Sequence, residues 1–171
     1  MEEEKSLVDQ IASETYDASE RPFDYVEEGT DTALVCESDP LTRERITSAL
    51  KENGYLVTEA DASQDALRFM RFHQYQLIVI NEVFDADTPS GNEVLAYLQN
   101  LVMNQRRYIF VVLVSGEYRT ADNMAAFNQS VNMIINKANL DDAGSIIKRG
   151  VSEHEEFYRL FRDTAIKLGR Y

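Results

Sequence analysis

The chain has 171 residues, of which 44% are hydrophobic, and its formal net charge at pH 7 is −13. A chain of this length and apolar content can form one core, with short additions to a single domain. The excess of acidic residues argues against unspecific binding to nucleic acid or to an anionic membrane, and no apolar run reaches the roughly 18 residues that a membrane-spanning helix needs. The acidic start MEEEKSLVDQ differs from a basic and then apolar secretory signal, so we expect a cytoplasmic protein.

The first segment, residues 1–32, differs in character from the rest of the chain. It carries 11 acidic and 2 basic side chains and so accounts for −9 of the net charge. Its apolar side chains are a cluster at Leu7, Val8 and Ile11 and the stretch PFDYVEEG. We predict an acidic leader that is poorly ordered or lies against the domain.

From Thr32 onward, short apolar runs alternate with amphipathic stretches. The run ALVCE predicts a strand with the single cysteine, Cys36, as a small buried residue. In SDPLTRERITSALKENG, Ser38 or Asp39 can cap a helix that has Pro40 at its first position and Gly54 at its end. Further strands are predicted at YLVTEA, QLIVIN, YIFVVLVS and VNMIIN, and further helices at SQDALRFMRFH, GNEVLAYLQNLV, TADNMAAFN and from about Asp141 onward.

Five strands that alternate with five helices predict parallel strands joined by right-handed crossovers, which form a three-layer α/β sandwich. In such a sheet the functional site lies beyond the carboxyl ends of the strands. The polar residues at these predicted ends are Glu37, Ser38, Asp39, Asn81, Ser115 and Lys137.

Four stretches, VCESDPLTRERI, LIVINEVFDADTPSGNEVL, VVLVSGEY and IINKA, together resemble the receiver domain of bacterial response regulators. The resemblance covers about Ala33 to Gly150, which we take as the domain 33–150. It implies a flavodoxin-like five-stranded sheet of order 2-1-3-4-5. In that family an acidic pair binds magnesium and an Asp ending the third strand accepts a phosphoryl group. A Ser or Thr ending the fourth strand bonds a phosphoryl oxygen, and a Lys ending the fifth pairs with it.

Carried over by position, the resemblance implies Glu37 and Ser38 for the acidic pair, Asn81 for the acceptor, Ser115 for the hydroxyl and Lys137 for the lysine. Two of the three carboxylates are therefore replaced. An amide is a poor nucleophile, and a hard divalent cation prefers carboxylate ligands. We predict a degenerate receiver that is not an enzyme, is not phosphorylated and needs no cofactor.

Two alternatives remain open. The domain could be phosphorylated at an irregular acceptor, Glu82, Asp85 or Asp87, with weak magnesium binding at Glu37 and Asp39. These acceptors lie on a loop two residues longer than in the family. A small flavodoxin-like enzyme or nucleotide binder is the alternative from another class, although no glycine-rich phosphate loop follows the first strand. Two further departures from the family are Ile134 in place of an aromatic residue and Ala138 in place of a proline.

The segment 151–171 extends beyond the resemblance as a predicted helix. An apolar stripe runs along it with alternating spacings of four and three: Ile147, Val151, His154, Tyr158, Phe161, Ala165 and Leu168. Phe157 and Leu160 widen this stripe, and Gly144 and Gly150 weaken the helix and suggest bends. His154 fits a position in the stripe better than a phosphate-accepting histidine.

The stripe either packs on the same domain or binds a partner helix, including that of a second copy of the chain. We take Val151, Tyr158, Phe161 and Leu168 as the candidate interaction surface. The resulting hypothesis is a signalling module that works by protein contact, through its fourth helix, fifth strand and last helix.

Overall fold

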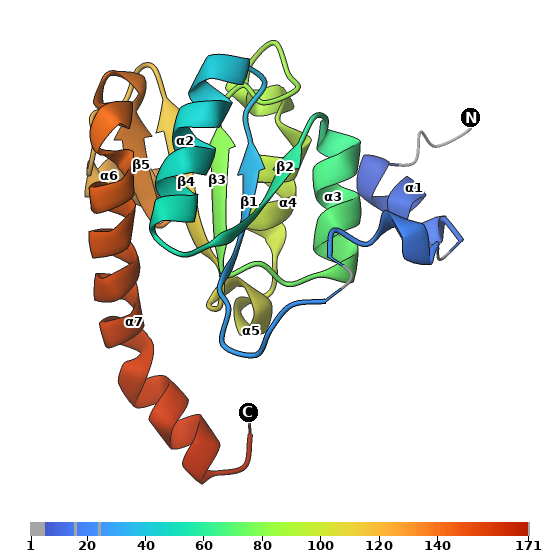
Figure 1. Ribbon diagram of the computed structural model, residues 1–171, viewed down its shortest axis with the longest axis vertical. Coiled ribbons are helices and arrows are strands. Elements are labelled where there is room, and N and C mark those ends of the chain that lie inside the picture. Colours follow the sequence, from blue (N-terminus) through green and yellow to red (C-terminus); the bar gives the residue numbers. More distant parts are fainter. Residues whose placement is uncertain (1–5, 16, 24, 171) are drawn as a thin grey trace.

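The computed structural model describes residues 6–15, 17–23 and 25–170 (Figure 1). Its centre is one sheet of five parallel strands in the order β2-β1-β3-β4-β5. The strands are β1 (Thr32–Cys36), β2 (Leu56–Ala60), β3 (Leu77–Asn81), β4 (Phe110–Ser115) and β5 (Met133–Asn136). The helices are α1 (Leu7–Ser13), α2 (Pro40–Glu52), α3 (Ser63–Phe72), α4 (Glu93–Asn100), α5 (Met103–Arg106), α6 (Asn123–Asn128) and α7 (Ala143–Lys167), with 3-10 turns at Ala18–Glu20, Pro89–Gly91 and Lys137–Asp142.

The sheet is covered on both faces, which confirms the predicted flavodoxin-like three-layer sandwich. Alternate residues of a strand point to opposite faces, so the core has two parts. On one face, strand residues such as Ile78 and Leu113 pack with helices α3, α4 and α6. On the other face, residues such as Val79 and Val112 pack with α2 and α7. Strands β1, β3 and β4 are buried along their whole length, as central strands covered on both faces must be.

Helix α2 begins and ends where its sequence predicts. The Asp39 carboxylate accepts a hydrogen bond from the Thr42 amide at 2.8 Å, and Pro40 occupies the first helical position. Gly54, with φ of +90°, follows the helix in the left-handed conformation that glycine adopts without strain.

The helix predicted over GNEVLAYLQNLV is shorter than expected. Helix α4 ends at Asn100, and a separate four-residue helix, α5, follows at Met103. The Arg106 guanidinium holds α5 in place by donating to the Ser130 carbonyl at 3.1 Å and to Asn132 Oδ1 at 2.8 Å. The chain is extended at Leu101 and Val102, between the two helices.

In the described part of the acidic leader, helix α1 lies against the domain. Ile11 of α1 is buried in the core on the α3 side of the sheet. Arg71 of α3 donates to the Ile11 carbonyl at 2.6 Å, and Arg68 makes a paired hydrogen bond and salt bridge with Glu14. Further along, the Phe23 ring contacts the ring of His73. Of the apolar residues in the stretch PFDYVEEG, Tyr25 is exposed, whereas Phe23 and Val26 are half-buried.

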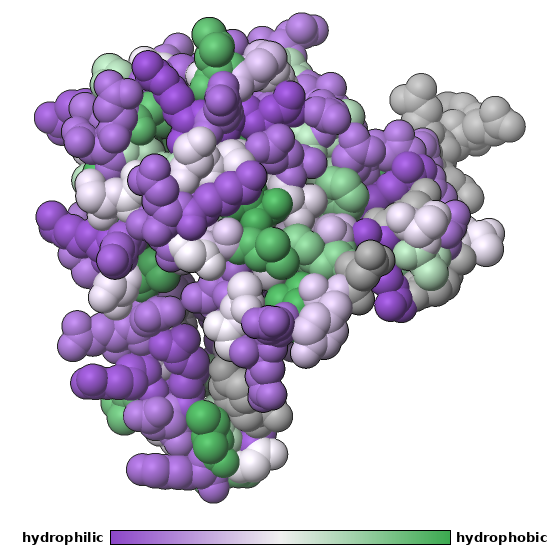
Figure 2. Space-filling model, in the orientation of Figure 1, coloured by the Kyte–Doolittle hydropathy of each residue, from purple (hydrophilic) through white to green (hydrophobic). Residues whose placement is uncertain are grey.

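Helix α7 runs without a break from Ala143 to Lys167, so the bends expected at Gly144 and Gly150 do not interrupt it. A Cβ atom at Gly150 would lie 2.3 Å from Met133 Cε and 3.0 Å from Phe110 Cζ, so this glycine lets α7 approach β4 and β5 closely. Beyond Val151 the helix projects past the sheet (Figure 1). In Figure 2 this projecting part stands apart from the body, and its visible side is mainly hydrophilic with some hydrophobic atoms near its lower end. None of the helices described in residues 6–170 is both long and apolar enough to cross a bilayer.

Candidate functional site

The predicted site residues lie where β1, β3 and β4 end side by side. The strand register pairs Cys36 with Ile80 and Asn81 with Val114. Glu37, Asn81 and Ser115 therefore come to the same edge of the sheet, and all three are buried. The structure thus places these three residues together at the carboxyl ends of β1, β3 and β4.

Asn81 and Glu37 are bonded directly to each other. The Asn81 side-chain amide donates from Nδ2 to Glu37 Oε2 at 2.7 Å, and the second oxygen of Glu37 accepts from the Asp39 amide at 3.0 Å. Asn81 Oδ1 accepts from the Val83 amide at 3.1 Å. Both carboxylate oxygens of Glu37 and both polar atoms of the Asn81 side chain therefore already have partners in the chain.

A second buried carboxylate, that of Glu82, occupies the other half of the site. The Ser115 hydroxyl donates to Glu82 Oε2 at 2.8 Å, and the Gly116 amide donates to Oε1 at 2.8 Å. Ser115 Oγ in turn accepts from the amides of Glu117 and Tyr118 at 3.0 and 3.1 Å. The carboxylate of Glu82 therefore holds the hydroxyl and the backbone at the start of the loop after β4.

The loop after β3 is tied down at two points. Asn92, which caps α4 by accepting from the Leu95 amide, donates from Nδ2 to the Asn81 carbonyl at 2.9 Å. Asp85 has a φ of +50° and accepts from the Ser63 amide at 2.8 Å, at the start of α3. The sequence signalled the cap, because Asn92 directly precedes an apolar helical run, but not the bond to Asn81.

The remaining predicted site residues contribute less. Ser38 Oγ accepts only a long contact of 3.5 Å from the Asp85 amide. Asp39 uses its carboxylate to cap α2, and hydrogen bonds from Thr42 hold the pKa of Asp39 below its usual value, with a smaller contribution from the charge of Lys137.

Lys137 follows β5 directly, but its side chain is exposed. Within residues 6–15, 17–23 and 25–170, no carboxylate lies within 4 Å of its ammonium group, so the structure does not pair it with Glu37.

The other acidic residues offered as irregular acceptors are placed differently from one another. Glu82 is buried and bonded to Ser115, whereas Asp85 and Asp87 are exposed. Over the described residues, no three His, Cys, Asp or Glu side chains come together as a metal-binding group. The role of Glu82 as an acceptor for Ser115 was not predicted, since the sequence signals only that a carboxylate follows a buried strand.

The candidate interaction surface on α7 is divided between two directions. Val151 packs on the core between the sheet and α2, and Tyr158 is half-buried beside the ring of His154, with ring centroids 4.8 Å apart. Phe161 lies under the Arg107 guanidinium at 4.2 Å and is 42% exposed. Leu168 is exposed. Half of the proposed surface therefore faces the chain's own domain.

Comparison with solved structures finds the same fold in other receiver proteins. A response regulator from Thermotoga maritima is 22% identical, with a TM-score of 0.56 over 72% of this chain and 98% of that chain. An orphan response regulator of H. pylori is 16% identical, with a TM-score of 0.55 over 73% and 99%. NtrX from Brucella abortus, solved in complex with ADP, is 18% identical, with a TM-score of 0.62 over 82% of this chain but 30% of that longer chain.

A search of curated proteins found no match. Residues 33–148 match the family described as "Response regulator receiver domain", which spans the sheet, the site at its carboxyl edge and the first part of α7. The chain therefore belongs to the response regulator receiver domain family, whose members act in two-component signalling.

Proposed function

We propose that this receiver domain signals by binding a protein partner and is not switched by phosphorylation. One observation carries the proposal: the groups at the carboxyl edge of the sheet are bonded to each other. Asn81 donates to Glu37, and Ser115 donates to Glu82, in both cases in buried positions. A phosphoryl group or a metal ion would have to break these bonds before it could bind.

The chemistry of the two positions supports the same proposal. Asn81 has no anionic oxygen with which to attack phosphorus, so an acyl phosphate cannot form there. Glu37 is a single carboxylate whose two oxygens accept from Asn81 and Asp39, whereas magnesium requires several oxygen ligands in octahedral geometry. We therefore propose that the domain works without magnesium.

Glu82 gives the proposal a physical basis beyond the missing acceptor. In the family, the hydroxyl that ends the fourth strand bonds a phosphoryl oxygen; here the Ser115 hydroxyl bonds a carboxylate that is a permanent part of the chain. The amide of Gly116 bonds the same carboxylate. Because the Glu82 carboxylate is always present, phosphorylation can no longer shift the population between two conformations of this loop. We therefore propose that the loop after β4 stays in one conformation.

The partner would bind on the face formed by α6, β5 and α7. On α6, Met124 and Phe127 are 69% and 78% exposed and lie three residues apart, on the same side of the helix. Exposed apolar side chains that cluster on one face indicate a binding surface for another protein. On α7, Phe161 and Leu168 are further exposed apolar side chains. A second copy of the chain is one of the partners that we propose for α7.

The test is titration of the protein with beryllofluoride, a phosphoryl mimic, in the presence of magnesium. We expect no saturable binding by calorimetry and no change in the amide resonance of Gly116, because Glu82 already bonds this amide. The matched control is the double variant Asn81→Asp with Ser38→Asp, which restores two carboxylates at the site. Tight, magnesium-dependent binding to the unaltered protein would overturn the proposal.

A further inference from the structure

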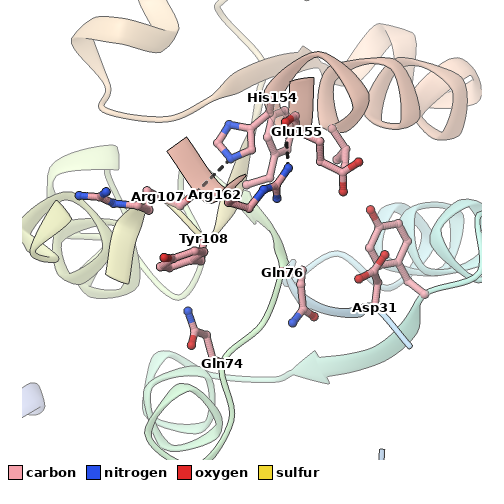
Figure 3. A pocket seen from close by; sticks show the side chains of 11 residues that line it. Asp31, Gln74, Gln76, Arg107, Tyr108, His154, Glu155 and Arg162 are labelled. Atoms are coloured by element: carbon pink, nitrogen blue, oxygen red, sulfur yellow. Dashed lines mark hydrogen bonds between the residues drawn. The ribbon is translucent and has the colours of Figure 1, made fainter. Parts of the chain in front are cut away.

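The segment 152–168, which consists of the projecting part of α7 and of Leu168 directly after it, has two different sides. On the side toward the domain, His154, Tyr158 and Arg162 are partly buried. His154 and Arg162 line a cavity of about 450 Å³ together with Arg107 and Tyr108. Figure 3 shows the His154 ring next to the backbone of Arg107, whose side chain points away. The His154 ring is engaged by the domain itself, through the Arg107 carbonyl at 3.2 Å and the Phe110 ring. This side is therefore occupied by the chain's own domain.

The other side carries an exposed apolar stripe. Phe157 and Leu160 are each 78% exposed and Leu168 is 64% exposed, and Thr164 continues their spacing of three and four residues. Residues at this spacing lie above one another on one side of a helix. Exposure of large apolar side chains along the stretch from Phe157 to Leu168, about 17 Å at 1.5 Å per residue, costs free energy unless another surface covers them.

Charge along the same segment is strongly polarised. Its first part carries three acidic residues and no Lys or Arg, whereas its second part carries three basic residues and one acidic residue. The acidic residues of the first part are Glu153, Glu155 and Glu156, and the charged residues of the second part are Arg159, Arg162, Asp163 and Lys167. A surface that pairs with this segment must therefore present the opposite order of charges.

We propose that a second copy of the chain binds this stripe with the two α7 helices antiparallel. The reversed helix presents basic residues opposite the acidic part and acidic residues opposite the basic part, so that Glu153 faces Lys167 of the second copy. A parallel pair would instead place like charges opposite each other, which is unfavourable. This proposal rests on the proposed function in one respect, namely that α7 makes a contact with a protein.

The geometry of the projecting helix fits this arrangement. Leu160 is the midpoint of residues 152–168, so a two-fold axis beside Leu160 brings the end of each helix to the point where the other leaves its domain. Such a contact is self-complementary and closes as a dimer. A single pair of helices about 25 Å long is small for a protein interface, so we expect a dimer whose population rises with concentration.

Disulfide trapping in the full chain tests both the contact and its direction. The natural cysteine, Cys36, is completely buried, so the unaltered protein should not cross-link under mild oxidation. Leu160→Cys should cross-link to its own copy, because the axis passes beside it. Arg159→Cys, an exposed neighbour that points away from the stripe, is the matched control and should cross-link at least tenfold more slowly.

Two further variants show whether the two α7 helices are antiparallel or parallel. Glu153→Cys and Lys167→Cys should each fail to cross-link alone and should cross-link when the two proteins are mixed. Cross-linking of Glu153→Cys to itself would show a parallel pair and overturn the proposal, as would equal rates for Leu160→Cys and Arg159→Cys. Circular dichroism of each variant confirms that the fold is retained. The beryllofluoride titration is independent of these results, so the two proposals can fail separately.

Discussion

Ser115 donates its hydroxyl hydrogen to Glu82 across the ends of two neighbouring strands, at 2.8 Å and in a buried position. Glu82→Ala removes the acceptor for this hydroxyl and for the Gly116 amide. A buried donor left without a partner costs about 1–3 kcal/mol, so we expect the free energy of unfolding in urea to fall by roughly that amount. Glu117→Ala, at an exposed position on the same loop, is the control and should have no measurable effect. An unchanged stability of Glu82→Ala would show that the bond is unimportant.

Asn81→Asp replaces the side-chain amide by a carboxylate and so places a second carboxylate beside that of Glu37. The Asn81 amide lies 2.7 Å from Glu37 Oε2, and two carboxylates at that distance repel each other unless one binds a proton or a cation. We expect the variant to be less stable than the parent at pH 7, with the difference shrinking as the pH falls and one carboxylate becomes protonated. Millimolar magnesium should restore part of the loss in the variant and leave the parent unchanged. Equal stability of the two proteins at pH 7, measured by urea unfolding, would contradict this prediction.

Protonation of His154 should weaken the attachment of α7. Asn132 Oδ1 accepts from Arg106 and from the Val111 amide, so its Nδ2 faces His154 Nδ1 at 3.4 Å. A proton on Nδ1 would place two donors against each other. Burial lowers the pKa of His154, and the charges of Arg106 and Arg162 lower it further, while the hydrogen bond to the Arg107 carbonyl opposes the shift.

The sign of the pH effect follows from this lowered pKa. The unfolded chain binds the proton more readily than the folded one, so the stabilisation is complete above the ordinary histidine pKa of about 6.5 and is lost as the pH falls below it. His154→Phe keeps the ring but cannot be protonated, and it should reduce the slope of stability against pH below neutrality. His73, whose pKa is also lowered by burial, remains in both proteins. Identical slopes for parent and variant would argue against the assignment.

The contact of α1 with the domain should depend on Ile11. This side chain is 3% exposed, whereas its neighbour Ala12 is exposed on the same helix. Ile11→Asp would bury a charge and should release residues 6–15, which hydrogen exchange would report as loss of amide protection there with protection retained in the sheet. Ala12→Asp adds the same charge at the surface and should leave the protection of α1 close to that of the parent. Equal loss in both variants would show that α1 is held by charge and not by packing.

The two glycines of α7, half-buried Gly144 and buried Gly150, should respond oppositely to alanine. At Gly144 a Cβ atom would meet Ala49 Cβ at 3.4 Å, an ordinary contact, and alanine favours a helix by up to about 1 kcal/mol over glycine. At Gly150 the same atom would overlap Met133 and press on Phe110, and overpacking costs about 1–3 kcal/mol. Thermal unfolding should therefore show a melting temperature that is raised or unchanged for Gly144→Ala and lowered for Gly150→Ala. A raised value for Gly150→Ala would show that Met133 moves aside without cost.

Much of the fold could be predicted because its signals are local. Apolar runs such as LIVIN mark strands that are buried on both faces, and cap residues such as Asp39 mark the start of a helix. The break between α4 and α5 could not be predicted, because the apolar pattern continues through Leu101 and Val102. Helix α5 is anchored by Arg106, which bonds Ser130 and Asn132, and such contacts between residues far apart in the sequence are not visible in a local pattern.

The position of the candidate site at the edge of the sheet was predicted, but the hydrogen bonds among its side chains were not. Strand ends located Glu37, Asn81 and Ser115 at one edge of the sheet, and the structure places them there. The pairing of Ser115 with Glu82 depends on how the chain turns after β3, which a single sequence does not reveal. The resemblance also assigned Lys137 to the site, but its side chain is exposed to solvent.

The two ends of the described chain are attached to opposite faces of one sheet, α1 through the core beside α3 and α7 through the core beside α2. No described segment joins the two faces except by way of the sheet and its connections. A mechanical load applied between the leader and the end of α7 therefore acts on the sheet, whose strands β1, β3 and β4 are buried along their whole length.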